Sequence, residues 1–167
     1  LKKIEKKVLW LACWMIHNAN HIRENQDGLK VGGHQASSAS IVSIMTALYF
    51  NILRPEDRVA VKPHASPVFH AIQYLSGLQT KEKIENFRGF GGAQSYPSRT
   101  KDIDDVDIST GSVGLGVAMT SFISLIQDYI ARKKFYNNRQ LGRMIALVGD
   151  AELDEGNVMS VFKKDGN

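Results

Sequence analysis

Apolar residues recur at steps of three and four along several stretches of the chain, which is the spacing of one face of an α-helix. The first stretch runs from the amino end to about Arg23. The others cover residues 41–48, 68–75 and 117–130. We therefore predict an amphipathic helix in each of these four stretches.

Residues that favour helix ends flank these stretches. Ser38 or Ser40 can cap the second helix, and Gly77 can close the third. Thr80 can cap a further short helix that ends near Phe87. These positions predict where the helices begin and end.

Two apolar runs are short and partly β-branched, Val59–Val61 within Arg58–Lys62 and Met144–Val148. Such runs are typical of buried strands. Because they alternate with the helices, the chain is predicted to have an α/β fold with a parallel sheet and helices on both faces.

Composition narrows the class of protein. The chain has 167 residues, 43% of them hydrophobic, which suits a soluble globular domain with a sizeable core. Its net charge of +4 comes from basic residues scattered among acids, so we expect no nucleic-acid partner.

No apolar run is long enough for a membrane span, and no signal-peptide pattern opens the chain. Cys13 is the single cysteine and lies among apolar residues at helical spacing, which predicts a core thiol in a reducing compartment. We therefore expect a cytoplasmic protein.

An acidic segment directly follows the second predicted strand and begins Gly149-Asp150-Ala151-Glu152. Ligands of open α/β sheets bind at the carboxyl ends of strands, and a helix start over residues 152–158 would offer free N–H groups to an anion. One carboxylate plus phosphate oxygens commonly holds Mg²⁺. The spacing excludes an EF-hand loop, because Val161 stands where a bidentate glutamate is required. An acidic helix start that only complements the helix dipole is the alternative.

A glycine run, Gly111, Gly114 and Gly116, opens the last long helix and predicts close approach of the backbone to a ligand. Its G-x-x-G-x-G spacing differs from the dinucleotide fingerprint, and the chain has no P-loop. A packing role for these glycines is the alternative.

Two histidines, His34 and His64, lie in loops next to glycine or proline, which makes them better functional candidates than histidines in helical patterns such as His70. We expect His34, His64 and Asp150 to meet at one edge of the sheet. The stretch from Arg88 to Asp107 lacks periodicity, and a loop of that length in a compact domain is usually functional.

Four blocks follow one another in a fixed order: Gly33-His34, Lys62-Pro63-His64-Ala65-Ser66-Pro67, Thr110–Gly116 and Gly149–Glu155. Together they resemble the cofactor-binding half of the transketolase superfamily, and in particular the homodimeric type of pyruvate dehydrogenase decarboxylating subunit. The similarity extends from about Leu9 to Asn157.

The resemblance implies thiamine diphosphate and Mg²⁺ as cofactors. Asp150 matches the metal-binding acid of the G-D-G motif, in which Ala151 replaces the final glycine. The neighbouring Gly149 and Glu152 are then expected to contribute to cofactor binding, with the backbone of Ala151 and Glu152 remaining usable. Gly111, Ser112 and Val113 match the backbone segment beside the aminopyrimidine ring.

The resemblance also implies three catalytic residues. His64 matches a histidine near the diphosphate and the reaction centre, and His34 matches one that faces the substrate. Tyr96 precedes Pro97 where transketolases carry a third histidine, which favours a 2-oxo acid over a ketose phosphate as substrate.

The expected activity is decarboxylation of a 2-oxo acid, as in pyruvate dehydrogenase, or ketol transfer, as in transketolase. Residues 1–167 then form a partial cofactor-binding domain that continues beyond residue 167 and works as a homodimer or beside a pyrimidine-binding domain. The second metal ligand and the activating glutamate are expected outside the chain, which alone would be inactive. A noncatalytic interaction subunit and a nucleotide-binding α/β domain are the alternatives.

Overall fold

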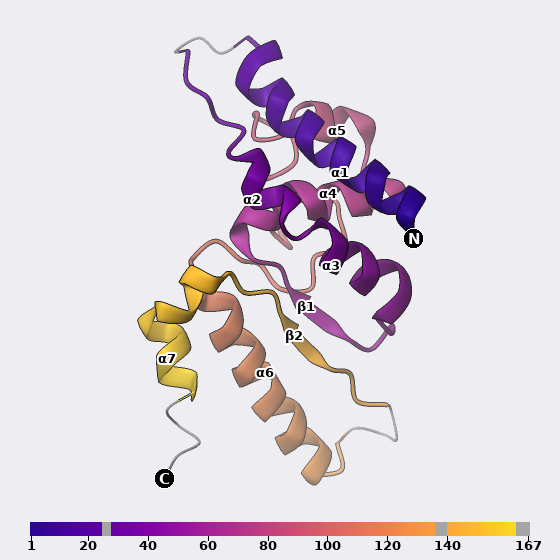
Figure 1. Cartoon of the computed structure of the whole chain (residues 1–167). Helices are drawn as coiled ribbons and strands as arrows, with labels where there is room; N and C mark the ends of the chain where they lie inside the picture. Colours follow the sequence, from indigo (N-terminus) through magenta and orange to yellow (C-terminus); the bar gives the residue numbers. More distant parts are fainter. Residues whose placement is uncertain (25–27, 136–139, 163–167) are drawn as a thin grey trace. The chain divides into compact units, whose positions relative to one another are not determined.

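The computed structural model of the chain, drawn in Figure 1, describes residues 1–24, 28–135 and 140–162. The chain divides into two compact units. The first unit combines Leu1–Leu53 with Pro63–Val106, and the second combines Arg54–Lys62 with Asp107–Asn167. In their described residues, the first unit consists of helices and loops, and the second contains the sheet.

The first unit is built around a buried helix. Helix α4, Ser66–Leu75, is buried along its first eight residues, and helices buried on all sides form the centre of a core. Helix α1, Lys2–His17, packs against α4 and continues as a π-helical turn over Asn18–Ile22. The predicted helix to about Arg23 is therefore confirmed. Helices α2, Gln35–Ala39, and α3, Val42–Ala47, also contact α1 and α4.

The predicted cap at Ser38 or Ser40 is wrong. Two short helices replace the single one, and neither serine is at the N-cap of either helix. The Ser38 hydroxyl donates a hydrogen bond to the carbonyl of His64 over 3.2 Å, and the Ser40 hydroxyl donates to the carbonyl of Ser37 over 3.0 Å. Serine hydroxyls that find such acceptors are not used to cap a helix start.

The other predicted helix ends of this unit are confirmed. Helix α5, Lys81–Glu85, begins after Thr80, whose side chain accepts a hydrogen bond from the N–H of Lys83. Gly77 follows α4 with a φ of +77°, a conformation that glycine adopts without strain. Between Arg88 and Asp107 the chain forms turns but no helix or strand, in agreement with its lack of periodicity.

The second unit has the predicted α/β character. Strands β1, Arg58–Ala60, and β2, Met144–Ala146, pair in parallel, with Val59 opposite Ile145. Both strands are shorter than predicted, although the N–H of Leu147 still donates to the carbonyl of Ala60. Helix α6, Leu115–Arg132, packs against both strands, and α7, Gly156–Phe162, packs against α6 (Figure 1).

A buried carboxylate fixes the start of both strands. Asp57 accepts hydrogen bonds from the backbone N–H groups of Arg54 and Arg143, over 2.9 and 2.8 Å. It also pairs with the guanidinium of Arg143 at 2.6 Å. Hydrogen bonds from Arg143 hold the pKa of the Asp57 carboxyl far below its ordinary value. Asp57 thereby sets how the two strands align.

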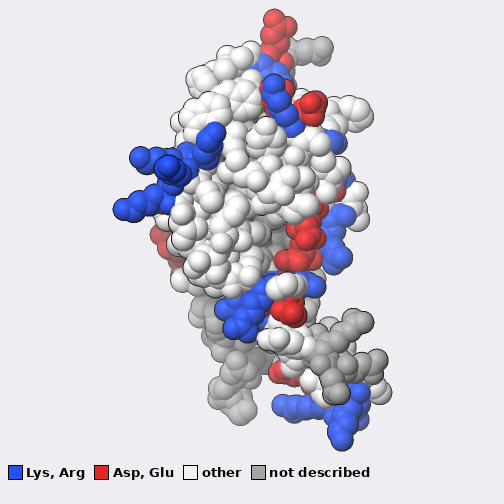
Figure 2. All heavy atoms as spheres, turned by 90° about the vertical axis from the view of Figure 1, so that its right-hand side faces the viewer, with Lys and Arg blue, Asp and Glu red and all other residues white. Residues whose placement is uncertain are grey.

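Several apolar residues lie at the surface. On α6 the side chains of Phe122, Leu125, Ile126 and Tyr129 are each more than half exposed, although they occupy the predicted apolar face. Cys13 is only half-buried, so the prediction of a core thiol is wrong. On the face drawn in Figure 2, basic and acidic side chains lie in small groups separated by uncharged areas. None of the described helices has both the length and the apolar character needed to cross a membrane.

Candidate functional site

The chain segments that leave the two strands come close together at Gly149. A Cβ atom added at Gly149 would lie 3.2 Å from Nζ of Lys62 and 3.7 Å from Cγ of Glu152. Lys62 follows β1, and Gly149 follows β2, so this contact lies at the carboxyl edge of the parallel sheet. Ligands of open α/β sheets bind at this edge.

Asp150 begins a 3₁₀ turn, Asp150–Asp154, and the predicted helix start over residues 152–158 is only partly observed because α7 begins at Gly156. The N–H of Gly149 donates to Oε2 of Glu152 over 2.7 Å, and the N–H of Glu152 donates to the carbonyl of Gly149 over 3.0 Å. These bonds close the turn and occupy the N–H of Glu152, which was expected to remain usable for an anion. Asp150 and Ala151 remain exposed.

The acidic side chains of this turn fit a cation. The exposed carboxylate of Asp150 is a hard oxygen ligand of the kind that Mg²⁺ prefers. Oε1 of Glu152 is buried without a hydrogen-bond partner among the described residues. A buried carboxylate oxygen without a partner is costly, and a cation nearby would offset that cost. The oxygen atoms of this turn are therefore of the kind that a divalent cation binds.

The loop before α6 packs on the first strand. The Thr110 hydroxyl donates to the carbonyl of Val61 over 2.8 Å, and a Cβ at Gly116 would lie 3.2 Å from that of Ala60. Gly114 has a φ of +76°. Gly114 and Gly116 are thus explained by the fold. In the same loop Gly111 and Ser112 are exposed and Val113 is half-buried.

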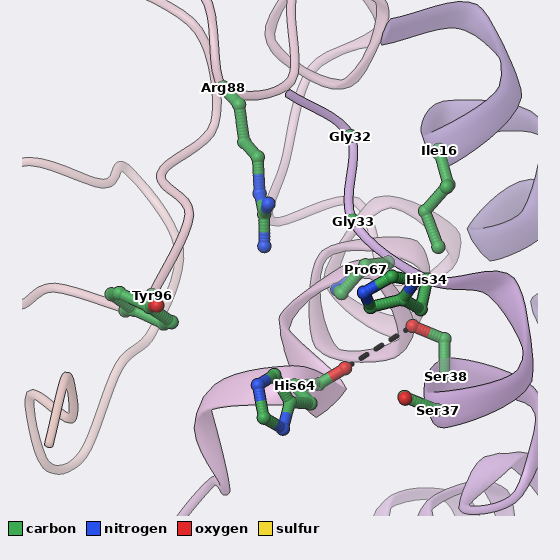
Figure 3. A pocket seen from close by; sticks show the side chains of 10 residues that line it. All are labelled: Ile16, Gly32, Gly33, His34, Ser37, Ser38, His64, Pro67, Arg88 and Tyr96. Carbon is green, nitrogen blue, oxygen red and sulfur yellow. Dashed lines mark hydrogen bonds between the residues drawn. The ribbon is translucent and has the colours of Figure 1, made fainter. Parts of the chain in front are cut away.

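In the first unit, His34, His64 and Tyr96 line one pocket with a volume of about 210 Å³ (Figure 3). His34 immediately precedes α2, His64 lies in a 3₁₀ turn before α4, and Tyr96 comes from the long loop. The bond from Ser38 to the backbone of His64 ties two walls of the pocket together. The structure therefore brings the three predicted catalytic residues to one place.

Sequence reasoning missed Arg88, which lines the same pocket. Arg88 starts the aperiodic loop, and its backbone has a φ of +61°, which is uncommon for a residue with a side chain. Burial lowers the pKa of its guanidinium, and nearby Tyr96 acts in the opposite direction. Its position in the functional loop was the only signal in the sequence that pointed to it.

A second polar cluster holds the long loop in place. The ring of His70 is completely buried, with Nδ1 2.6 Å from Oδ2 of Asp104 and Nε2 3.0 Å from the carbonyl of Gln94. Asp102 accepts hydrogen bonds from the N–H groups of Gln94 and Ser98, which lie two residues before and after Tyr96. The ligand atoms of His70, Asp102 and Asp104 lie close enough together for a metal ion, but they already have these partners. This cluster is best described as a support for the loop that carries Tyr96.

These features describe an α/β chain with a candidate ligand site at the carboxyl edge of its parallel strands. The family model described as "Transketolase, thiamine diphosphate binding domain" matches residues 31–165. The chain therefore belongs to this family of thiamine diphosphate-binding domains, as the resemblance of its motifs implied.

Curated relatives agree with this assignment. The chain is 26% identical to the pyruvate dehydrogenase E1 component of Buchnera aphidicola subsp. Schizaphis graminum over 163 residues. The E1 components of Escherichia coli (strain K12) and Pseudomonas aeruginosa are 26% and 29% identical over the same length. Each of these alignments covers 92% of this chain and 18% of the relative. The chain thus spans about a fifth of the length of these relatives.

Proposed function

We propose that this chain supplies the thiamine diphosphate and Mg²⁺ site of a 2-oxo acid decarboxylating enzyme of the pyruvate dehydrogenase type. The observation that supports the proposal most strongly is the exposed carboxylate of Asp150, which directly follows Gly149 at the carboxyl edge of the parallel strands. The names of the curated relatives support the type of enzyme. A homodimer, or pairing with a pyrimidine-binding domain, is part of the proposal.

In the second unit, Asp150 would bind Mg²⁺ through a carboxylate oxygen, and the metal would neutralise part of the diphosphate charge. Gly149 lets the chain pass next to Lys62 without a side chain in the way. Ala151 is exposed and lies beside Asp150, so its backbone can face the diphosphate. Gly111, Ser112 and Val113 would support the aminopyrimidine ring with their backbone.

Thiamine diphosphate, when bound, supplies the carbon nucleophile and the electron sink that decarboxylation of a 2-oxo acid requires. In the first unit, the side chains of His34, His64 and Tyr96 line one pocket (Figure 3). Each of these groups can donate a hydrogen bond to an oxygen that gains negative charge, or carry a proton to or from it. We assign them these roles toward the substrate carbonyl.

A noncatalytic transketolase-like subunit is the second candidate function. The closed turn after β2 favours it, because the N–H groups of Gly149 and Glu152 already have partners within the chain. Such a subunit would retain the fold and its interactions while binding the cofactor weakly.

Replacing Asp150 by Ala tests the proposal. Calorimetry on the full-length protein would measure thiamine diphosphate affinity with and without Mg²⁺. Losing a metal ligand should weaken magnesium-dependent binding by at least about tenfold, since each tenfold step corresponds to about 1.4 kcal/mol. Asp154→Ala is the matched control, because Asp154 is an exposed acid at the end of the same turn. Equal affinity of wild type and Asp150→Ala would refute the assignment of Asp150, and a wild type that does not bind would favour the noncatalytic subunit.

A further inference from the structure

Arg88 gives the pocket of the first unit a permanent positive charge. Arginine stays protonated at every physiological pH, and Arg88 is the only lysine or arginine among the described residues that line this pocket. No aspartate or glutamate lines the pocket in the described part of the chain. In Figure 3 the Arg88 side chain extends into the space bordered by Tyr96, His34 and His64. The pocket is therefore electrostatically suited to a small anion.

The guanidinium has donors to spare. Nη1 donates one hydrogen bond, to the carbonyl of Val31 over 2.7 Å, and the group stacks on Phe87 with Cζ 5.2 Å from the ring centroid. Nε is buried without a partner, and the described residues include no carboxylate paired with Arg88. A guanidinium has five N–H donors in a planar fork, so the edge formed by Nη1 and Nη2 can bind both oxygens of a carboxylate.

The surrounding backbone is shaped around this side chain. A Cβ at Gly33 would lie 3.2 Å from Nη1 and 3.4 Å from Nη2, so a side chain at this position would crowd the guanidinium. Gly33 and Arg88 both have positive φ values, +87° and +61°. Positive φ costs free energy at a residue with a side chain, and such strain concentrates at ligand sites. The chain thus holds the charge of Arg88 in the pocket despite burial and strain.

We propose that Arg88 binds the carboxylate of the 2-oxo acid substrate and so selects for substrates with a single negative charge next to the reacting carbonyl. This inference rests on the proposed function of the pocket and adds its substrate-binding residue. The fork of Arg88 holds the carboxylate, and the carbonyl oxygen then lies within the pocket beside His34, His64 and Tyr96. A phosphate dianion fits less well, because one guanidinium leaves half of its charge uncompensated in a partly buried pocket.

A non-reactive probe tests the proposal directly. Oxamate has the shape and charge of pyruvate but lacks a reactive ketone, and pyruvamide is a neutral counterpart. Ligand-observed NMR on the full-length protein would measure the affinity of both compounds, and of inorganic phosphate, for wild type and variants. We expect wild type to prefer oxamate over pyruvamide and phosphate. Arg88→Gln should weaken oxamate binding by about tenfold or more, which is typical for loss of a hydrogen bond to a charged group.

Two further variants make the test specific. Arg88→Lys keeps the charge but loses the planar fork, so it should bind oxamate more weakly than wild type and more tightly than Arg88→Gln. If Arg88→Gln does not fold, Arg88→Lys alone still decides the matter, because unchanged oxamate affinity would rule out the fork. Lys101→Gln removes an exposed charge from the same loop outside the pocket and should leave the affinity unchanged.

The outcomes separate this inference from the proposed function. Equal oxamate affinity of wild type and Arg88→Gln would overturn the role of Arg88, and so would absence of oxamate binding to wild type or a preference for phosphate. Thiamine diphosphate binding, measured in parallel, reports on the proposed function. If the cofactor binds but Arg88 has no effect on oxamate, only the inference fails. If the cofactor does not bind, the proposed function fails whatever the oxamate result.

Discussion

Removing Asp57 should destabilise the second unit by an amount that the structure allows us to work out. In Asp57→Ala the backbone N–H groups of Arg54 and Arg143 lose their acceptor. Each partly buried donor without a partner costs about 1 to 2 kcal/mol. The Arg143 side chain is half exposed, so its guanidinium can turn to water and adds little. We therefore expect a loss of about 2 to 4 kcal/mol in the free energy of unfolding.

Urea denaturation followed by circular dichroism would measure this loss. Asp57→Asn is the matched variant: it keeps the shape and one acceptor oxygen, so it should lose about half as much. The pKa of Asp57 is lowered in the folded state, so its ionised form stabilises the fold. That contribution is complete above the ordinary value of 3.8 and declines as the pH falls further. The difference between wild type and Asp57→Asn should therefore shrink below about pH 4.

A loss below about 1 kcal/mol for Asp57→Ala at pH 7 would refute the role of Asp57 as the anchor of both strands. A difference between wild type and Asp57→Asn that stays constant from pH 7 to pH 3 would contradict the lowered pKa. Because β1 and β2 lead to Lys62 and Gly149, we also expect Asp57→Ala to weaken thiamine diphosphate binding.

Two further predictions concern stability and use thermal unfolding as the measurement. His70→Leu should cost about 3 kcal/mol or more because it leaves Oδ2 of Asp104 buried without its partner. Asp104→Asn should cost only about 1 kcal/mol, because an amide can donate to Nδ1 of His70 and accept from Gln79. Equal losses would contradict the pairing. Gly142→Ala should lower the free energy of unfolding by about 2 kcal/mol or more, because its Cβ would meet the carbonyl of Glu56. Gly156→Ala should be neutral or stabilising, because a Cβ at Gly156 would lie in open space. Equal stability of these two glycine variants would show that the backbone contact at Gly142 is unimportant.

Much of the fold follows from local patterns in the sequence. The spacing and length of the apolar runs predicted helices α1, α3, α4 and α6 and the two parallel strands, but not α2. The ends of elements were less predictable. Ser38 has the side chain of a helix cap, but its hydroxyl bonds to the backbone of His64, 26 residues away. Such a partner depends on the tertiary fold and leaves no local pattern.

The candidate site was predictable where a motif carries the chemistry. His34, His64 and Tyr96 come from three separate segments, and the resemblance to a family grouped them before the structure showed them in one pocket. Arg88 belongs to no motif that we recognised. Its place in the pocket depends on a loop that buried side chains hold from a distance, including His70, which is 34 residues from Asp104. Packing of this kind cannot be inferred from spacing along the chain.

The most direct test of the central claim is a calorimetric titration of the full-length protein with thiamine diphosphate, with and without Mg²⁺, and with ATP as the comparison ligand. We predict saturable binding of thiamine diphosphate that requires Mg²⁺ and is lost in Asp150→Ala, with no comparable binding of ATP. Preference for ATP, or thiamine diphosphate binding that is independent of both Mg²⁺ and Asp150, would contradict the assignment of the carboxyl edge of the strands as the magnesium diphosphate site.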